Sequence, residues 1–261
     1  MEEILLKMES ACDIVGAFQL QHWNKVDALA VNDKSLNQLV SFVDQQSEQM
    51  LVEALLMAVP GSTIIGEESA SENRVLTEYT WVIDPLDGTT NFLHGLPVFS
   101  ISVALLHQGI PVVGIVDCPV LKERFTAIKG KGARLNGTPI YVSGNSNLKD
   151  SLLATGFPYH NFAEMQAYID VLTYFMQNTR GLRRMGSAAI DLAYTACGRF
   201  DGFFELNLSP WDIAAGVLLV TEAGGKVSTF DGKTEVVFEN QILASSDGLY
   251  SEMMNVLRTS F

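Results

Sequence analysis

The chain has 261 residues, 48% of them hydrophobic, so it can bury a substantial core as one large domain or as two closely packed halves. Its formal net charge is −13, from 17 Lys and Arg against 30 Asp and Glu, which argues against a broad nucleic-acid-binding face. If the substrate is an anion, the same acidity predicts that bound cations mediate its binding, because carboxylates alone would repel it.

The N-terminus and the cysteines predict where the protein resides. The opening segment Met1-Glu2-Glu3 has neither the basic region nor the apolar run of an export signal, and no apolar run approaches the roughly 20 residues that span a bilayer. Cys12, Cys118 and Cys197 are widely separated and lack a C-x-x-C spacing, which indicates reduced thiols. We therefore expect a soluble, cytoplasmic protein without a membrane partner.

Apolar residues at helical spacing predict two amphipathic helices near the N-terminus, from Ile4 to Phe18 and from Leu39 to Met57. Pro60-Gly61 ends the second helix, and the polar segment 21–37 between them is expected to form a mobile loop. From Thr63 onward, short apolar runs separated by Gly, Pro and Asp predict a sheet with several hairpins. The expected strands lie at 64–65, 81–83, 98–106, 112–116 and 124–128.

After about residue 150, strands and helices alternate. The expected strands lie at 152–155, 182–184 and 202–205, and the expected helices at 164–176, 187–197 and 210–222. This order predicts an α/β (α+β) fold of alternating helix and sheet layers. We expect an N-terminal α+β half, residues 1–145, and a C-terminal α/β half, residues 146–261, in one compact unit.

An acidic motif follows one of the predicted strands. The segment Asp84-Pro85-Leu86-Asp87-Gly88-Thr89-Thr90-Asn91 comes after the apolar run Trp81-Val82-Ile83 and before a predicted helix. Asp84 and Asp87 supply hard oxygen ligands, and the amides of Gly88 and Thr89 can donate to phosphate oxygens at a helix N-terminus. Because Asp-Pro and Asp-Gly are common turn dipeptides, the alternative is a plain strand-to-helix turn.

Two distant segments add acidic partners to this motif. Gly66-Glu67-Glu68-Ser69 ends the apolar run at residue 65, although such a pair of glutamates is usually solvated surface charge. Ser209 suits a helix N-cap, Pro210 suits the first helical position, and Asp212 falls in the first turn, where capping alone can explain a carboxylate. Together with the motif, these segments predict a divalent-metal and phosphate site.

These three segments resemble the signatures of the inositol monophosphatase family. The resemblance extends over nearly the whole chain, and it is closest to the bacterial inositol-1-monophosphatase branch. The segments that carry it further are Thr155-Gly156-Phe157-Pro158, Arg183-Arg184-Met185-Gly186-Ser187-Ala188-Ala189 and Thr221-Glu222-Ala223-Gly224-Gly225. The resemblance implies a layered αβαβα sandwich of the inositol monophosphatase and fructose-bisphosphatase-like type.

The resemblance also implies a metal centre with two to three Mg²⁺ ions per site. Glu67, Asp84 and the Leu86 carbonyl would hold one ion, while Asp84, Asp87 and Asp212 would hold a second. A third, more weakly held ion would lie near Glu67. Retention of several waters by such an ion fits the coordination habits of Mg²⁺.

The resemblance assigns the chemistry to a few side chains. Thr89, with Glu67 and Asp44, would orient and activate a metal-bound water for direct attack on phosphorus, without a covalent phosphoenzyme. Asp87, Gly88 and Thr89 would contact the phosphate. The implied activity is a Mg²⁺-dependent phosphomonoesterase.

The resemblance places substrate choice in the C-terminal half. Glu205, Asp212 and the backbone of Gly186, Ser187 and Ala188 would contact a sugar-alcohol ring. The implied substrates are myo-inositol 1-phosphate and related polyol monophosphates, and the implied assembly is a homodimer.

The sequence departs from the family pattern just before Asp44. Gln38-Leu39-Val40-Ser41 stands where the family has an Asp-Leu-Val-Thr-like segment, and Val43 stands in place of a threonine. Two alternatives stay open. One is the same chemistry on histidinol phosphate, a fructose bisphosphate or a 3′-phosphoadenosine nucleotide, and the other is a mainly regulatory or binding role with incidental phosphatase activity.

Overall fold

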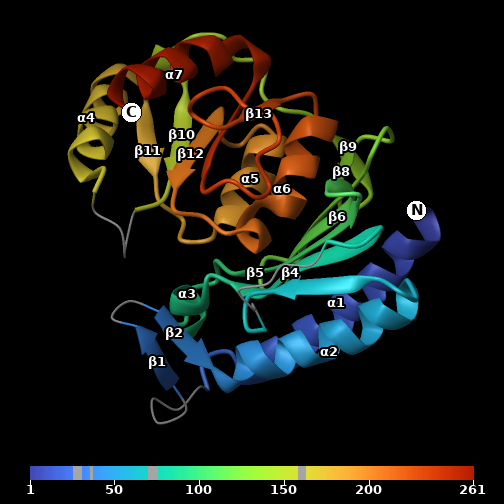
Figure 1. Ribbon diagram of the computed structural model, residues 1–261. Helices are drawn as coiled ribbons and strands as arrows, with labels where there is room; N and C mark the ends of the chain where they lie inside the picture. Colours follow the sequence, from blue (N-terminus) through green and yellow to red (C-terminus); the bar gives the residue numbers. More distant parts are fainter. Residues whose placement is uncertain (26–30, 36–37, 70–75, 158–162) are drawn as a thin grey trace.

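The structure, a computed structural model, describes residues 1–25, 31–35, 38–69, 76–157 and 163–261, and in 31–35 and 38–41 the backbone alone. In the described part of the chain, helices and sheets stack in five alternating layers (Figure 1). The order is α1 and α2, a first sheet, α5 and α6, a second sheet, and α4 and α7. The predicted layered α/β fold is confirmed.

The described elements have the following bounds. The helices are α1 (Glu2–His22), α2 (Phe42–Ala58), α3 (Thr89–Leu93), α4 (Met165–Asn178), α5 (Ala188–Ala196), α6 (Pro210–Glu222) and α7 (Asp247–Ser260), with a short 3-10 helix at Leu148–Asp150. The first sheet has the spatial order β3 (Thr63–Gly66), β4 (Tyr79–Asp87), β5 (Ser100–His107), β6 (Ile110–Cys118), β7 (Glu123–Ile128), β8 (Ala133–Leu135) and β9 (Thr138–Ile140). The second has the order β11 (Gly181–Arg183), β10 (Leu152–Thr155), β12 (Gly202–Leu206), β14 (Gln241–Ser245) and β13 (Lys226–Ser228), while β1 (Val31–Ser35) and β2 (Gln38–Ser41) pair separately.

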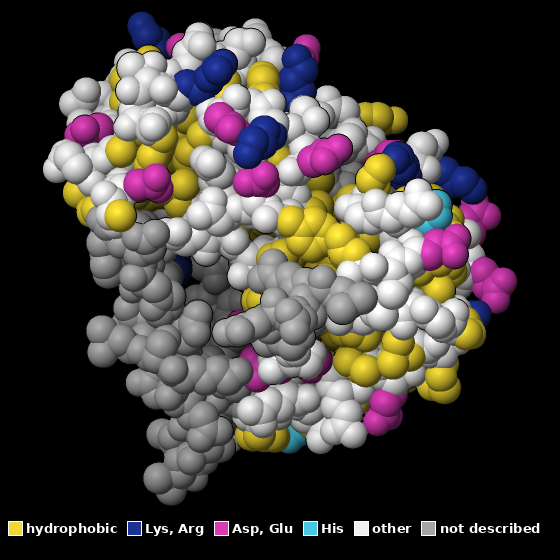
Figure 2. Space-filling model, viewed as in Figure 1, with side chains coloured by type: hydrophobic (Ala, Val, Ile, Leu, Met, Phe, Trp, Pro, Cys, Tyr) yellow, Lys and Arg dark blue, Asp and Glu magenta, His cyan; other side chains and the backbone are white. Residues whose placement is uncertain are grey.

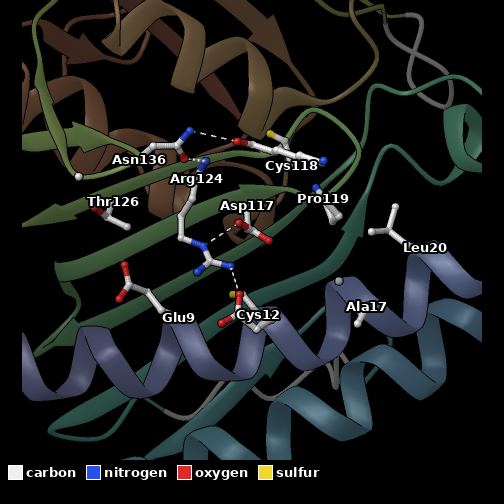
Figure 3. A pocket seen from close by; sticks show the side chains of 14 residues that line it. Glu9, Cys12, Ala17, Leu20, Asp117, Cys118, Pro119, Arg124, Thr126 and Asn136 are labelled. Carbon is white, nitrogen blue, oxygen red and sulfur yellow. Dashed lines mark hydrogen bonds and ion pairs between the residues drawn. The ribbon is translucent and has the colours of Figure 1, made fainter.

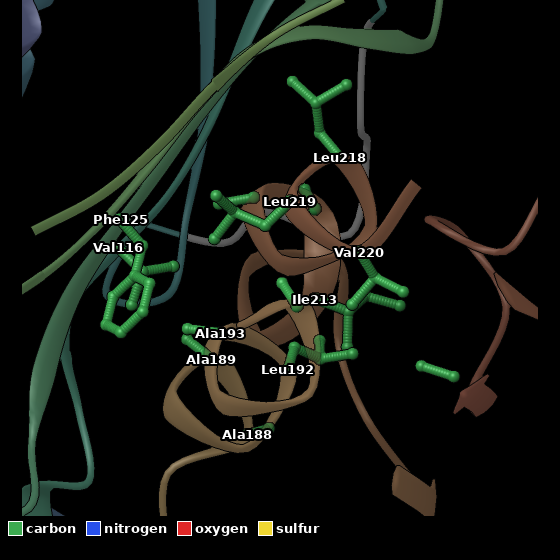
Figure 4. Close-up of a cluster of buried hydrophobic side chains, with 14 of the residues drawn as sticks. Val116, Phe125, Ala188, Ala189, Leu192, Ala193, Ile213, Leu218, Leu219 and Val220 are labelled. Atoms are coloured by element: carbon green, nitrogen blue, oxygen red, sulfur yellow. The ribbon is translucent and has the colours of Figure 1, made fainter. Parts of the chain in front are cut away.

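The first sheet is apolar on both faces, because alternate residues of each strand face different helix layers. On β4, Trp81 and Ile83 are buried against α1 and α2, whereas Val82 is buried in the core shared with α5 and α6. Figure 4 shows that second core, where Ala189 of α5 and Leu219 of α6 gather with side chains of the sheet. The central helices are therefore covered by a sheet on each side.

The N-terminal helices differ from the prediction at one boundary. Leu39 lies in β2, and α2 begins at Phe42, so the expectation that the helix starts at Leu39 is wrong. A short apolar run such as 39–40 fits the periodicity of a helix as well as that of a strand. Here the run lies in a strand that pairs antiparallel with β1. The segment 21–37, expected as one mobile loop, instead carries the end of α1 and the strand β1, while 26–30 and 36–37 lie outside the described residues.

In the C-terminal part, the predicted elements agree closely with the structure as far as α6, and further elements follow α6 that were not predicted. The helix predicted at 210–222 and the strand predicted at 152–155 have those bounds in the structure. The sequence patterns do not predict β13, β14 or α7. β14 pairs antiparallel with β12, and α7 packs beside α4 on the outer face of the second sheet (Figure 1).

The surface mixes charges of both signs. On the face shown in Figure 2, Lys and Arg side chains of the described surface lie among Asp and Glu side chains. Ion pairs such as Lys226 with Asp247, at 2.5 Å, neutralise basic side chains locally. None of the described helices is long and apolar enough to cross a membrane.

The contact between α5 and α6 depends on a glycine. A Cβ added at Gly216 would lie 2.5 Å from Leu192 Cβ, so Gly216→Ala must push the two helices apart. We expect the free energy of unfolding to fall by about 1–3 kcal/mol, the cost of overpacking, although alanine is the better helix former. Urea denaturation followed by circular dichroism measures the change. Gly144→Ala is the control, because its added Cβ meets no described atom within 4 Å, and equal stability of both variants would contradict the packing argument.

Candidate active site

The acidic motif is shaped by a β-bulge at the end of β4. Asp84 lies opposite Ser102 and Asp87 lies opposite Ser100, so three steps along β4 match two steps along β5. In an unbroken strand, residues three apart point to opposite faces, but Ser100 and Ser102 share a face. The extra residue therefore brings both aspartates to the same side of the sheet. The motif was expected after the strand, whereas β4 continues through Asp87.

A glutamine of α1 forms a hydrogen bond to the backbone of the bulge. Gln19 is fully buried, and its Nε2 donates to the Pro85 carbonyl at 2.7 Å. The amide of Leu86 donates to Asp84 Oδ1 at 2.9 Å, which orients that carboxylate. The Leu86 side chain packs in a small cluster with Val43, Phe92 and Phe99. Gln19 was not predicted as a site residue, although a polar residue within the apolar stripe of α1 is a sign of a buried role.

Thr89 lies where α2 and α3 meet. Its Oγ1 is 3.0 Å from Asp44 Oδ1 and 3.1 Å from the Leu86 carbonyl oxygen, and both are within reach of its single hydrogen. Asp44 is buried in the first turn of α2. Gly88 precedes α3 with φ +97°, a left-handed conformation that favours glycine. Residues 44 and 89, far apart in sequence, are thus in direct contact.

Asp87 is anchored to the C-terminal part of the chain. Its Oδ2 accepts hydrogen bonds from Ser187 Oγ at 2.5 Å and from the Ala189 amide at 2.8 Å, at the N-terminus of α5. Ser187 is also the N-cap of α5, where its Oγ accepts from the Ile190 amide. The structure therefore places the Ser187 hydroxyl on Asp87, in addition to any contact with substrate.

Asn91 links the motif to the segment that enters α5. Its Nδ2 donates to the Val98 carbonyl at 2.7 Å and to the Met185 carbonyl at 2.9 Å. Asn91 is buried, so both bonds are shielded from water. The role of this side chain was not predicted, because its partners are backbone carbonyls, which no residue pattern reveals.

Asp212 has the capping geometry that the sequence predicts. Ser209 is the N-cap of α6, Pro210 is its first residue, and the Ser209 amide donates to Asp212 Oδ2 at 2.6 Å. This bond involves one oxygen of the carboxylate. The cap therefore does not by itself exclude a second role for Asp212.

The carboxylates of the site raise one another's pKa. Burial raises the pKa of Glu67 to about 8, and the charges of Asp212 and Asp44 add to the effect. Burial likewise raises the pKa of Asp212 to about 8, with Asp87 adding. The pKa of Asp84 is raised well above its ordinary value by burial and then by Glu67 and Asp87. Such crowding of like charges in a buried place is typical of a functional site.

Hydrogen bonds oppose the rise in the pKa of Asp87. Burial raises its pKa to about 6, while the Ser187 hydroxyl and the Ala189 amide favour the charged form. Asp87 is therefore the member of the cluster with the most donors aimed at it.

The residues expected to contact a ring lie beside this cluster. Glu205 is partly buried on β12, and burial raises its pKa to about 8 while the charge of Arg184 opposes the rise. A Cβ at Gly156 would overlap the Glu205 carboxylate, which shows that this carboxylate lies directly against the Gly156 backbone. A Cβ at Gly88 would lie 3.3 Å from the Gly186 carbonyl, which shows how closely the motif approaches the entry to α5.

The donor set fits a hard divalent cation, because it consists of carboxylate oxygens and a backbone carbonyl. The candidates are Glu67, Asp84, Leu86, Asp87 and Asp212. Among the described residues, no three His, Cys, Asp or Glu side chains are grouped closely enough to hold an ion as they stand. Asp84, Asp87 and Asp212 each accept a hydrogen bond from a backbone amide on one carboxylate oxygen.

A cavity of about 480 Å³ lies elsewhere, between α1 and the strands β6 and β7 (Figure 3). None of the predicted site residues lines it. Its most polar feature is Arg124, whose guanidinium is already paired with Asp117 at 2.7 Å and with Asp13 at 2.6 Å. Cys12 and Cys118 also line it, and burial raises the pKa of both thiols, which leaves them unreactive.

Known proteins resemble this chain over nearly its full length. The sequence profile of the inositol monophosphatase family matches residues 1–260. The putative Nus factor SuhB of Neisseria meningitidis serogroup B is 44% identical over 242 residues, 93% of each chain. The inositol-1-monophosphatase of Synechocystis is 40% identical over 242 residues, 93% of this chain and 84% of that protein. The crystal structure of extragenic suppressor protein suhB from Bartonella henselae has a TM-score of 0.90 at 36% identity, covering 99% of both chains.

The link made by Asn91 predicts a stability effect. Asn91→Ala removes both donors and leaves the carbonyls of Val98 and Met185 without that partner, so we expect the free energy of unfolding to fall by about 1–3 kcal/mol. Asn178→Ala is the control, since its side chain makes a comparable bond to a carbonyl in an exposed position. Chemical denaturation of both variants measures the difference. Equal stability of the two would contradict the linking role.

Proposed function

The chain belongs to the inositol monophosphatase family, and from this premise we propose that it is a phosphatase that hydrolyses polyol monophosphates, myo-inositol 1-phosphate among them, with Mg²⁺. The observation that carries the proposal is that the β4 bulge places Asp84 and Asp87 on one side of the sheet, while Thr89 bonds to Asp44. Burial, and then the charges of Glu67 and Asp87, raise the pKa of Asp84. Carboxylates that repel one another in a buried place are stabilised by a divalent cation.

The proposed ion ligands come from β4, from α6 and from Glu67, which follows the end of β3. Glu67, Asp84 and the Leu86 carbonyl would hold one Mg²⁺, and Asp84, Asp87 and Asp212 a second, with a weaker third ion near Glu67. When bound, the ions would polarise the phosphoryl oxygens and lower the pKa of water at the site.

Thr89 and Asp44 are proposed to handle the proton of the attacking water. Because Thr89 Oγ1 donates its own hydrogen to Asp44, its lone pairs are directed away from that carboxylate and can accept a hydrogen bond from water. The proton can then pass through Thr89 Oγ1 toward Asp44, with Glu67 as a second acceptor nearby. The water oxygen bonds to phosphorus directly while the bond from phosphorus to the alcohol oxygen breaks. The leaving oxygen takes up a proton from solvent, so the products are free alcohol and phosphate.

The remaining residues are proposed to bind substrate. The amides of Gly88 and Thr89, with Asp87, would contact the phosphate at the start of α3. Glu205, Asp212 and the segment Gly186 to Ala188 would face the hydroxyls of a ring. On this proposal the site lies between the halves 1–145 and 146–261.

We also propose a cytoplasmic homodimer. Supporting it, α1 exposes Leu6 and Ile14 and α2 exposes Met57, with 65%, 58% and 75% of their surface accessible. Light scattering on the purified protein measures the assembly directly.

A second candidate function is supported by the names of relatives. The Neisseria meningitidis protein is named a putative Nus factor, which favours the binding or regulatory alternative for this chain. If a variant without phosphatase activity restores growth to a strain lacking the gene, the binding role is primary. If only active variants restore it, catalysis is primary.

Asp84 provides the sharpest test of the metal chemistry. Asp84→Asn removes the charge proposed to bridge two ions, so we expect kcat/KM for phosphate release from myo-inositol 1-phosphate with Mg²⁺ to fall by at least about 10²-fold. Asp150→Asn is the control, because Asp150 is exposed and paired with Arg180. An unchanged rate in Asp84→Asn would refute the mechanism. The same assay with histidinol phosphate, fructose bisphosphate and a 3′-phosphoadenosine nucleotide identifies the preferred substrate.

Thr89 tests the proton route. We expect Thr89→Val to lower kcat by about 10²–10⁴-fold, the usual contribution of a positioned acid–base group, with a smaller effect on KM. Thr89→Ser keeps a hydroxyl near Asp44 and should retain much of the activity. Equal losses in Thr89→Ser and Thr89→Val would show that the hydroxyl is not the essential group.

A further inference from the structure

Glu48 is a buried acidic residue that the proposed chemistry does not use. It lies on α2 one turn after Asp44, and only 5% of its surface is exposed. Residues four apart on a helix lie on the same face, so α2 presents two carboxylates side by side. Asp44 contacts Thr89, whereas Glu48 contacts the segment that follows β3.

The first contact of Glu48 is a hydrogen bond to the backbone next to Glu67. Glu48 Oε2 accepts from the amide of Glu68 at 2.8 Å. This amide belongs to the same planar peptide unit as the Glu67 carbonyl, so the bond fixes the orientation of the chain at Glu67. A charged acceptor makes such a bond stronger than a neutral one does.

The second contact is with Gly66, the last residue of β3. A Cβ added there would lie 2.5 Å from Glu48 Oε2 and 2.8 Å from its Cδ. Gly66 is not among the residues with positive φ, so its backbone does not require glycine. The missing side chain instead leaves room for the Glu48 carboxylate. The hydrogen bond and the missing Cβ are two separate observations, and each shows that residues 66–68 pack directly against the Glu48 carboxylate.

We propose that Glu48 is a positioning residue, which holds the 66–68 segment so that Glu67 faces the other carboxylates of the site. The inference rests on the proposed function, because it takes Glu67 as a cation ligand. Asp87 and Asp212 come from β4 and α6, and their hydrogen bonds come from the start of α5 and from the Ser209 amide. Loss of Glu48 therefore weakens the ion held by Glu67 and spares the ion held by Asp87 and Asp212.

The test is calorimetric titration of the full-length protein with Mg²⁺ alone, without substrate. Wild type is expected to show two classes of site. Glu48→Ala should lower the Mg²⁺ affinity of one class by about 10–100-fold, the usual effect of losing a residue that supports a metal ligand. Glu67→Gln should lower the affinity of the same class. The other class should keep its affinity. Glu48→Gln should bind like wild type, because its amide oxygen can accept the same hydrogen bond.

Gly66→Ala perturbs the contact between Glu48 and residues 66–68 by a change at Gly66 instead of at Glu48. We expect it to weaken the same class of site, since the methyl group displaces the Glu48 carboxylate. The double variant Glu48→Ala with Gly66→Ala should be no weaker than Glu48→Ala alone, because the methyl then occupies the space left by the carboxylate. This non-additivity is not expected of two unrelated losses of stability. Should Glu48→Ala fail to fold, Gly66→Ala and Glu48→Gln provide the comparison.

The outcomes separate this inference from the proposed function. If wild type binds Mg²⁺ and both Glu48→Ala and Gly66→Ala bind it equally well, the positioning role is overturned while the metal site stands. If Glu48→Gln is as weak as Glu48→Ala, charge matters rather than the hydrogen bond, and the positioning role is again overturned. If wild type binds no Mg²⁺, the proposed function and this inference both fail.

Discussion

Mutual repulsion among buried carboxylates is the constraint around which the centre of this molecule is organised. Asp84, Asp87 and Asp212 come from two elements. Burial raises the pKa of Asp84 and Asp212, and the charge of Asp87 raises both further. Holding like charges together costs free energy, so rigid structure must oppose their separation. The β-bulge, the Gln19 bond to the Pro85 carbonyl and the α5 N-terminus on Asp87 supply that rigidity.

The same arrangement explains why distant parts of the chain must fold together before a site exists. Asp44 reaches Thr89 from α2, and Ser187 reaches Asp87 from the start of α5. Each contact satisfies one oxygen of a carboxylate with a protein donor, which orients the group without neutralising it. A cation that binds the remaining oxygens would relieve the repulsion. Stability and the proposed chemistry would then depend on the same residues.

Sequence patterns predicted the features that depend on local order. Ser209, Pro210 and Asp212 predict the start of α6 because capping involves residues only a few positions apart. The bulge was not predicted, since it depends on how β4 pairs with β5, although Pro85 within a strand was a sign of irregularity. The bonds of Gln19 and Asn91 end on backbone carbonyls, so residue spacing does not reveal their partners. For the same reason the family resemblance implies roles for particular residues but does not indicate the side chains that support them.

The most direct test of the central claim is the free energy of unfolding of wild type and Asp84→Asn, each with and without Mg²⁺. We predict that Mg²⁺ stabilises wild type, by about 2.7 kcal/mol at 100 times the dissociation constant. Without Mg²⁺, Asp84→Asn should be at least as stable as wild type, because one repelling charge is gone, and Mg²⁺ should stabilise it much less. If Mg²⁺ leaves wild type unchanged, or stabilises both proteins equally, the carboxylate cluster is not a cation site.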